Sequence, residues 1–416
     1  MKLITTLLCL FTLINSSKAS DSTIIFRDIP YSSVFEVAKQ ENKPVLLYFH
    51  FNGCGGCINM EKNVFVDSAV ANFYNKNFIC FEVNTREGEG IETNKIYGIQ
   101  MHPTFLFLDK TGEDVHKIVG SFSPVQFIQE AKNALEQKNT LNSYIEQYQQ
   151  GNRDPKFLLD YCYRLQDAYE IDSLHIVEYI NTQSKADLAQ EHNIKFIYEF
   201  AIYHYDIFMP YDSEAFQFML QNQDLFAKYF DPEQVETRIV WILSSAIYEA
   251  IENQDEKRFN MLMEKRSPYD TGKTYLFKEM DGRTTGIMTS KSLALTSLML
   301  YYKKAGDTVK YQETLERYIS KIWDDAEALN QIAWNYYEQY NDAQQISLAI
   351  TWVKRSIALD SNYANHDTYA ALLYKLKDYK SSLEQAEIAI DIAKEKGLNY
   401  QETTNLIRKI QQEFEK

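Results

Sequence analysis

The sequence predicts an α/β sandwich with a central sheet, followed by an all-α helical repeat array. Eight of the 14 glycines lie between Gly53 and Gly120, and no proline follows Pro268, so turns are concentrated early in the chain. Strand and helix signals alternate before residue 140, whereas long amphipathic stretches with short polar breaks dominate after it. The length of 416 residues favours two or three domains over one.

Short apolar runs and helical spacing divide residues 20–140 into alternating elements. The apolar runs predict buried strands at residues 44–51, 78–83, 104–108 and 115–119. Apolar residues at helical spacing predict helices at residues 32–40, 58–74, 91–97 and 124–137, the last opened by Pro124 at a favourable first position. This alternation is typical of a mixed α/β domain with a central sheet.

The N-terminal 19 residues read as a targeting segment rather than as part of the fold. Met1-Lys2 is a short basic start, residues 3–14 are largely apolar, and Ser17 and Ala19 supply small residues at the −3 and −1 positions of a cleavage site. This pattern predicts a signal peptide at residues 1–19, cleaved after Ala19, and therefore an exported protein. The alternative is an uncleaved membrane anchor, but the apolar run is short for a membrane span.

Charge and cysteine content limit the classes of function. The net charge is −15 and there are no basic runs, which argues against a nucleic-acid partner. Of the five cysteines, Cys9 falls in the predicted signal peptide. The other four, Cys54, Cys57, Cys80 and Cys162, are too few to build a disulfide scaffold of this size. They are therefore available for chemistry or for burial.

The motif Cys54-Gly55-Gly56-Cys57 comes directly after a predicted strand and opens a predicted helix. The first sulfur would lie at a helix N-terminus, where free N–H groups and the helix dipole favour a thiolate. Cys57 would lie about one turn further on, close enough to form a disulfide. A C-x-x-C pair beside a βαβ pattern predicts redox chemistry. The alternatives are half of a zinc site, which would need further paired ligands, or two inert buried thiols.

Two stretches of residues 28–138 carry a further pattern. The first stretch is Lys43-Pro44-Val45-Leu46-Leu47-Tyr48-Phe49 through Cys57, with Met60-Glu61, Val64-Phe65, Asp67 and Val70 after it; the second is Met101-His102-Pro103-Thr104. Together these stretches resemble the thioredoxin superfamily, most closely the thioredoxin-like domains of periplasmic thiol–disulfide interchange proteins. The resemblance implies a thioredoxin-like sandwich over residues 20–140. It implies that Pro103 is a cis-proline across from the cysteines, that His102 lies beside the disulfide, and that the backbone before Pro103 binds the substrate chain.

The sequence departs from that family at three positions near the motif. Gly53 stands where the family often has tryptophan, Gly56 where a proline is common, and Tyr48 where many members have a buried acid. These departures leave the redox potential open. Beyond the motif, Cys80 and Cys162 are expected to be buried, inert thiols. A partly protonated His102 would stabilise the Cys54 thiolate.

The C-terminal part carries two similar segments within residues 325–392. Each segment would form a hairpin of a first and a second helix. Ala333 and Ala370 stand where the first helix needs a small residue, and Ala389 stands where the second helix needs one, as stacked helical hairpins require. These segments resemble tetratricopeptide repeats, although the first copy has Ser356 at its later small position. The sequence thus predicts a helical domain at residues 141–310, which could be divergent repeats, and tetratricopeptide-like repeats at residues 311–416.

The features together predict an exported, periplasmic thiol–disulfide oxidoreductase that uses Cys54 and Cys57 on client disulfides or dithiols. The prediction includes no metal and no organic cofactor. It requires a redox partner that the sequence does not identify, and the direction of electron transfer is open. The helical array would recruit a peptide or protein ligand. The alternative is a non-catalytic scaffold that binds partners, in which the first domain is structural or acts as a redox-controlled clasp.

Overall fold

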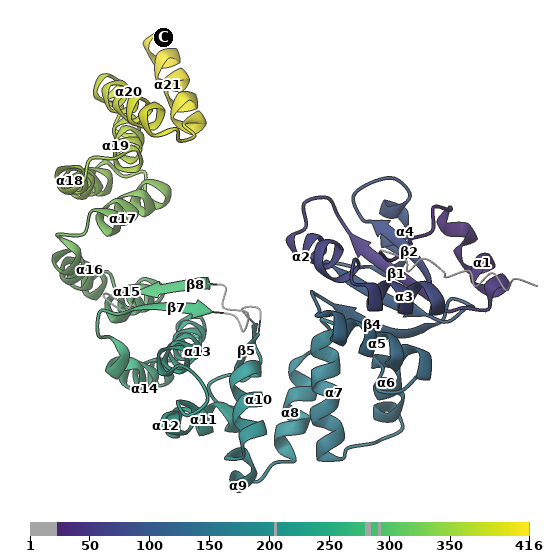
Figure 1. The fold of residues 1–416 in the computed structure, drawn as a ribbon. Helices are drawn as coiled ribbons and strands as arrows, with labels where there is room; N and C mark the ends of the chain where they lie inside the picture. The colour runs from purple at the N-terminus through teal and green to yellow at the C-terminus, as the bar shows by residue number, and fades with distance from the viewer. Residues whose placement is uncertain (1–22, 204–205, 279–283, 290–292, 416) are drawn as a thin grey trace, which may run out of the picture. The chain divides into compact units, whose positions relative to one another are not determined.

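The computed structural model describes residues 23–203, 206–278, 284–289 and 293–415. The chain divides into two compact units, at residues 1–193 and 194–416. The predicted signal peptide at residues 1–19 lies outside the described residues. Figure 1 shows the chain coloured from its N-terminus to its C-terminus.

A four-stranded sheet of order β2-β1-β3-β4 forms the centre of the first unit. Strand β1 is parallel to β2 and antiparallel to β3, and β3 is antiparallel to β4. The strands are β1 (Val45–His50), β2 (Ile79–Asn84), β3 (Thr104–Leu108) and β4 (Asp114–Val119). The four apolar runs in the sequence therefore all form strands of one sheet.

Helices cover both faces of this sheet, so each face forms part of a core. Because side chains alternate along a strand, Leu46 and Tyr48 of β1 enter one core while Val45, Leu47 and Phe49 enter the other. The longer helices that contribute to these two cores are α3 (Ser68–Asn77) and α5 (Pro124–Glu136) on the Leu46 side, and α1 (Val34–Glu41) and α4 (Gly90–Tyr97) on the other side.

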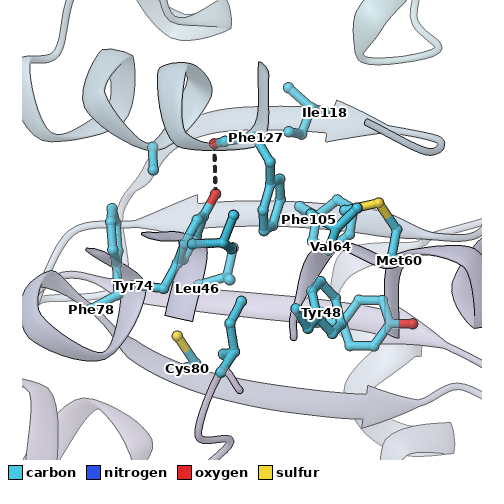
Figure 2. Packing of buried hydrophobic residues seen from close by; sticks show 14 of the residues in the cluster. Leu46, Tyr48, Met60, Val64, Tyr74, Phe78, Cys80, Phe105, Ile118 and Phe127 are labelled. Carbon is cyan, nitrogen blue, oxygen red and sulfur yellow. Dashed lines mark hydrogen bonds between the residues drawn. The ribbon is translucent and has the colours of Figure 1, made fainter. Parts of the chain in front are cut away.

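An aromatic contact joins α3 to α5 in the core drawn in Figure 2. The rings of Tyr74 and Phe127 stack with 4.5 Å between centroids. The Tyr74 hydroxyl donates a hydrogen bond of 2.8 Å to the Phe127 carbonyl, so this buried polar atom has a partner. Offset stacking together with a satisfied hydroxyl is a favourable way to bury tyrosine.

The single helix predicted at residues 58–74 is interrupted in the structure. Helix α2 (Gly55–Asn59) continues into a π-helical turn, η2 (Met60–Val64), and α3 begins only at Ser68. The Asp67 side chain caps α3 by accepting from Ala69 N and Val70 N at 2.9 and 3.1 Å. Apolar residues keep their helical spacing across the break between Val64 and Ser68, so periodicity alone predicts one continuous helix.

Four further helices belong to the first unit, and two of them contact β4. A buried polar network joins them to the sheet. His116 of β4 accepts from Leu141 N at 3.1 Å through Nδ1, so its Nε2–H donates to Glu130 of α5 at 2.9 Å. Arg164 donates to the same carboxylate at 2.9 Å. The helices are α6 (Leu141–Gln149), α7 (Pro155–Asp167), α8 (Ser173–Asn181) and α9 (Lys185–Leu188).

The second unit is largely helical, but it is not all-α as predicted. Strands β7 (Thr274–Lys278) and β8 (Thr284–Thr289) form an antiparallel hairpin, and β5 (Ile202–Tyr203) pairs with β6 (Asp206–Ile207). Gln234 donates to Leu276 O at 3.0 Å and accepts from Lys278 N at 3.2 Å. A side chain of α13 thus satisfies backbone groups of β7, a tertiary contact that no local sequence pattern reveals.

The remaining helices stack as neighbouring hairpins along the second unit, with α10 crossing the division between the units. Ala333, Ala370, Ala389 and Ser356, which stand at the predicted small positions, are all fully buried. Ser356 Oγ donates to Ala326 O at 2.7 Å, so serine fits a position where alanine packs elsewhere. No helix within the described residues has both the length and the apolarity of a membrane span.

The bounds of these elements are α10 (Glu191–Ala201), α11 (Glu214–Gln221), α12 (Gln223–Phe226), α13 (Pro232–Glu252), α14 (Glu256–Arg266), η3 (Ser267–Tyr269), α15 (Leu293–Ala305), α16 (Thr308–Ile322), α17 (Ala326–Gln339), α18 (Ala343–Leu359), α19 (Tyr363–Lys375), α20 (Tyr379–Lys396) and α21 (Gln401–Phe414). A short 3₁₀ turn, η1 (Tyr31–Ser33), precedes α1 in the first unit.

The Glu130 network predicts a pH dependence of stability. Burial alone would raise the pKa of Glu130, but the His116 hydrogen bond and the Arg164 charge outweigh it and lower the pKa to about 2. Because the folded pKa lies below the ordinary value of 4.5, the stabilisation is present above pH 4.5 and is lost as the pH falls toward 2. We expect Glu130→Gln to lower the free energy of unfolding by up to about 3 kcal/mol at pH 7.

The loss should shrink at pH 3, as measured by urea unfolding with hydrogen exchange of β4 and α5 peptides to assign the transition to the first unit. Glu136→Gln on the same helix is the matched control, because Glu136 is exposed. A loss of equal size at both pH values would contradict this account of Glu130.

Candidate redox site

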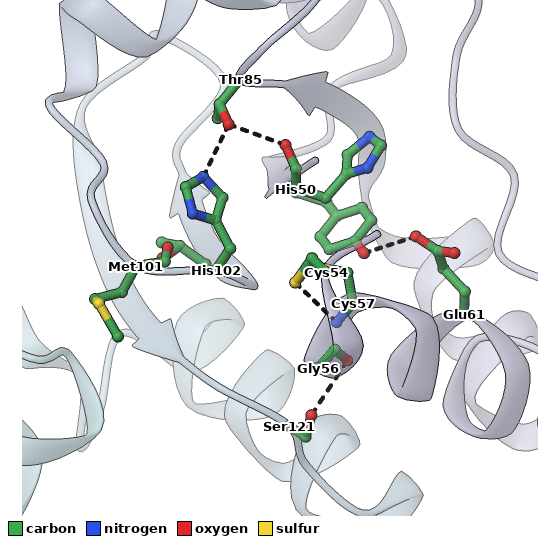
Figure 3. The surroundings of a disulfide bond; sticks show 11 residues. His50, Cys54, Gly56, Cys57, Glu61, Thr85, Met101, His102 and Ser121 are labelled. Carbon is green, nitrogen blue, oxygen red and sulfur yellow. Dashed lines mark hydrogen bonds between the residues drawn. A yellow bond between two sulfur atoms is a disulfide. The ribbon is translucent and has the colours of Figure 1, made fainter. Parts of the chain in front are cut away.

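Three chain segments meet at one edge of the sheet because of how its strands run. The parallel register pairs His50 of β1 with Asn84 of β2, so the segments after both strands leave at the same edge. The antiparallel register pairs Phe49 with Thr104, so the segment before β3 arrives there too. Figure 3 shows the result, with Cys54, Thr85 and His102 around one site.

Cys54 and Cys57 form a disulfide with 5.2 Å between their Cα atoms. Cys54 is the N-cap residue of α2, and its sulfur accepts from Cys57 N at 3.2 Å. The free N–H groups of a helix start favour negative charge at this sulfur once the disulfide is reduced. Cys54 is 6% exposed and Cys57 only 1%, so Cys54 is the sulfur that an incoming disulfide can reach first.

Gly56 lies directly against the segment that precedes β3. A Cβ atom at residue 56 would stand 2.9 Å from Cδ of Pro103 and 3.4 Å from Oγ of Ser121, whereas one at Gly55 would meet nothing within 4 Å. The Ser121 hydroxyl also donates to the Gly56 carbonyl at 3.2 Å. The absence of a side chain at residue 56 therefore allows the cysteine turn and Pro103 to touch. The His102–Pro103 peptide bond is cis.

Thr85 fixes the tautomer of His102. The Thr85 hydroxyl donates to the His50 carbonyl at 3.1 Å, so its contact of 3.0 Å with His102 Nε2 requires the ring nitrogen to carry the proton. Burial lowers the pKa of His102, and the nearby Arg86 and His50 lower it further. His102 is therefore a neutral imidazole at pH 7, in contrast to the partly protonated ring predicted from the sequence.

Tyr48 fills a position under the site and binds a carboxylate. Its hydroxyl donates to Glu61 Oε1 at 2.9 Å, and its ring stacks on His50 with 4.9 Å between centroids. Glu61 lies on the π-helical turn that follows α2. Burial raises the pKa of Tyr48, and the hydrogen bond to Glu61 raises it further, so the hydroxyl keeps its proton at neutral pH.

The two other described cysteines are unsuited to thiolate chemistry. Cys80 of β2 and Cys162 of α7 are both buried free thiols. Burial raises the pKa of each to about 12, so neither ionises near pH 7. Within the part of the chain that the structure describes, no group of three or more His, Cys, Asp or Glu residues is placed to hold a metal ion.

The structure brings Cys54, Cys57, His102 and Pro103 into one site, and it adds residues that the sequence analysis does not single out. The guanidinium of Arg86 lies over the Phe51 ring, 3.6 Å from its centroid. The Phe51 ring in turn meets His102 edge to face, with 5.1 Å between centroids. These contacts depend on the pairing of β1 with β2, and no local motif marks them.

Residues 31–135 match the family described as thioredoxin-like domain, and these residues form a thioredoxin-like α/β domain that carries a C-x-x-C disulfide. A candidate disulphide-isomerase from Bacteroides thetaiotaomicron is 31% identical; the match covers 28% of this chain and 98% of that one, with a TM-score of 0.26. A thioredoxin from Thermus thermophilus is 28% identical, covering 27% and 88%, with a TM-score of 0.25.

A curated relative, mouse spermatogenesis-associated protein 20, is 35% identical over 63 residues, which is 15% of this chain and 8% of that protein. This chain therefore matches only a small part of that relative. The family match ends at residue 135, and the comparisons do not identify the helical region as tetratricopeptide repeats.

The contact between Gly56 and Pro103 predicts different effects for the two glycines of the motif. Both lie in α2, where alanine is intrinsically better than glycine by about 1 kcal/mol. We expect Gly55→Ala to raise the free energy of unfolding by up to about that amount. Gly56→Ala should instead lower it by about 1–2 kcal/mol, because its Cβ displaces Pro103.

Urea unfolding of the oxidised protein measures both changes, and the rate of disulfide reduction by dithiothreitol reports the geometry of the turn. Equal effects of the two substitutions would show that the approach to Pro103 does not constrain residue 56.

Proposed function

We propose that the protein is a thiol–disulfide oxidoreductase that acts on client proteins through Cys54 and Cys57. The observation that carries this proposal is the disulfide at the start of α2, in which Cys54 is the more exposed sulfur and Pro103 lies against the turn. A thioredoxin-like domain with such a pair supports thiol redox chemistry. The two buried thiols elsewhere cannot substitute for it.

In the reducing direction, the Cys54 thiolate attacks one sulfur of a client disulfide, and the other client sulfur leaves as a thiolate. A mixed disulfide then joins Cys54 to the client. The Cys57 thiolate attacks Cys54 Sγ, which releases the second client thiolate and forms the disulfide seen in the structure. Two electrons pass to the client, and a dithiol redox partner must return them. The same steps reversed would oxidise a client dithiol.

Client binding would use the backbone beside Pro103. We propose that the peptide before Pro103 pairs with an extended client segment by strand-like hydrogen bonds, since Met101 and His102 are partly exposed. His102 stands there as a neutral ring held by Thr85. In this role His102 positions the client and contributes no charge to the Cys54 thiolate.

Substitution of single cysteines tests the redox proposal. Cys54→Ser should abolish reduction of insulin disulfides, because the sulfur that reaches the client is lost. Cys57→Ser should instead accumulate a mixed disulfide between Cys54 and the client, detectable by non-reducing gel and mass spectrometry. Cys80→Ser is the control and should retain full activity, since the Cys80 thiol is buried with a pKa of about 12. Insulin reduction that persists in Cys54→Ser would overturn the proposal.

A second function is favoured by a cavity of about 220 Å3 in the second unit. Residues of α15, α16 and α17 line it, among them Leu300, Met299, Tyr336 and the amides of Gln331 and Asn335. It is smaller than the roughly 300–1,000 Å3 of sites for drug-sized ligands, and its mixed apolar and amide lining suits a polypeptide side chain. We propose that the stacked helices are tetratricopeptide-like and recruit a client or partner polypeptide here.

Leu300→Asp tests this second function, because Leu300 is 49% exposed and the change should leave folding intact. In a Cys57→Ser background, we expect Leu300→Asp to reduce the yield of client mixed disulfides. With Cys57 intact, Leu300→Asp should reduce insulin at the wild-type rate. Val309→Asp is the matched control, since Val309 is 67% exposed on α16 and does not line the cavity. Equal client yields in both variants would remove the recruiting role of this cavity.

We also propose that the chain acts after export, most simply in the periplasm of a diderm bacterium. The proposal rests on the basic start, apolar run and small residues before Ser20. An oxidising compartment would favour the disulfide form of the Cys54–Cys57 pair.

A further inference from the structure

Arg86 places a positive charge beside the redox site. Its guanidinium lies flat over Phe51, 3.6 Å from the ring centroid, and Phe51 contacts His102, the residue before Pro103. Phe51 is also tied to the cysteine turn, because Cys54 N donates to its carbonyl at 3.2 Å. The charge of Arg86 therefore stands one aromatic ring away from the segment where a client chain would lie.

Arg86 differs from most other arginines of the described chain in having no carboxylate partner. Within the described residues, no carboxylate lies within salt-bridge distance of its guanidinium, and its side chain is exposed. By contrast, the arginines that pair with a carboxylate are Arg27 with Glu41, Arg153 with Glu178, Arg164 with Glu130, Arg258 with Asp212 and Arg355 with Asp324.

The segment around Arg86 is held on both sides. Thr85 bonds to His50 and His102, and Arg86 N donates to Asn84 Oδ1 at 3.1 Å. The adjacent Glu87 could have neutralised Arg86, but its carboxylate accepts from the Asn52 amide at 2.8 Å and from the Asn84 amide at 3.3 Å. The acid adjacent in sequence is thus bound by two amides rather than by Arg86, and the guanidinium is held in place by stacking on Phe51.

We propose that Arg86 selects clients in which an aspartate or glutamate flanks the reactive cysteine. A planar guanidinium that is already immobilised can bind a carboxylate through two hydrogen bonds with little loss of side-chain freedom. This inference rests on the proposed function, because it names the substrate class of the same site. It concerns recognition only and leaves the steps of sulfur exchange unchanged.

The test compares two disulfide-bonded peptides that differ only in whether aspartate or lysine flanks each cysteine. The full-length protein is reduced and desalted, and second-order rate constants for peptide reduction are measured at low and high salt. We expect the acidic peptide to react about five- to tenfold faster at low salt, with the ratio falling as salt screens the contact. Arg86→Glu should reverse the preference, and Arg86→Lys should retain part of it.

Lys76→Glu is the matched control. Lys76 is an exposed residue of α3 near the start of β1, where Lys43 contacts Asn75, and so at the opposite end of the sheet from the disulfide. It alters the net charge as Arg86→Glu does and should leave the peptide ratio unchanged. Equal rates for the two peptides, or equal shifts in both variants, would overturn the role of Arg86.

A small neutral disulfide, bis(2-hydroxyethyl) disulfide, shows whether a negative result concerns Arg86 alone or the redox activity as a whole. If the wild-type protein reduces it but does not distinguish the peptides, redox activity stands and the selection by Arg86 is wrong. If the protein reduces neither this compound nor either peptide, the proposed function is wrong and the inference falls with it.

Discussion

The position of strand β1 between a parallel and an antiparallel neighbour is the constraint on which the site depends. The segments after β1 and β2 and before β3 must meet at one edge, and they carry the cysteines, Thr85 with Arg86, and His102 with Pro103. Both faces of β1 are buried, so a shift of register by one residue would exchange the two cores. The same burial that stabilises the sheet therefore fixes the relative position of the redox groups.

Exposure and ionisation divide the four described cysteines into two classes. Cys54 and Cys57 lie where a helix begins, and helix dipoles and free N–H groups lower thiol pKa values there. Cys80 and Cys162 lie in apolar surroundings that raise theirs to about 12. Since the thiolate is the reactive form, the fold would confine the proposed exchange to one pair. Because His102 is neutral, positive charge near that pair comes from the start of α2 and from the guanidinium of Arg86.

Much of the first unit can be predicted from the sequence because its strands are continuous apolar runs and its cysteines sit between a strand and a helix. The break before Ser68 is harder to predict, since the apolar spacing continues across it, although Asp67 is a recognisable cap. The β7–β8 hairpin depends on Gln234 from another helix. The docking of α7 through Arg164, and the stacking of Arg86 on Phe51, join residues far apart in the chain. Such pairings follow from topology rather than from local pattern.

The acidity of the chain would not prevent the proposed binding of an acidic client beside the disulfide. At physiological ionic strength the Debye length is about 8 Å, so charges spread over a chain of this size are largely screened at the point of contact. Arg86 would meet a client side chain directly, and its carboxylate neighbour Glu87 is already bound by two amides. A direct guanidinium–carboxylate contact is screened much less than the distant acids, particularly when a docked client excludes water from it. At the proposed recognition site, the charge of Arg86 would therefore outweigh the net charge of the chain.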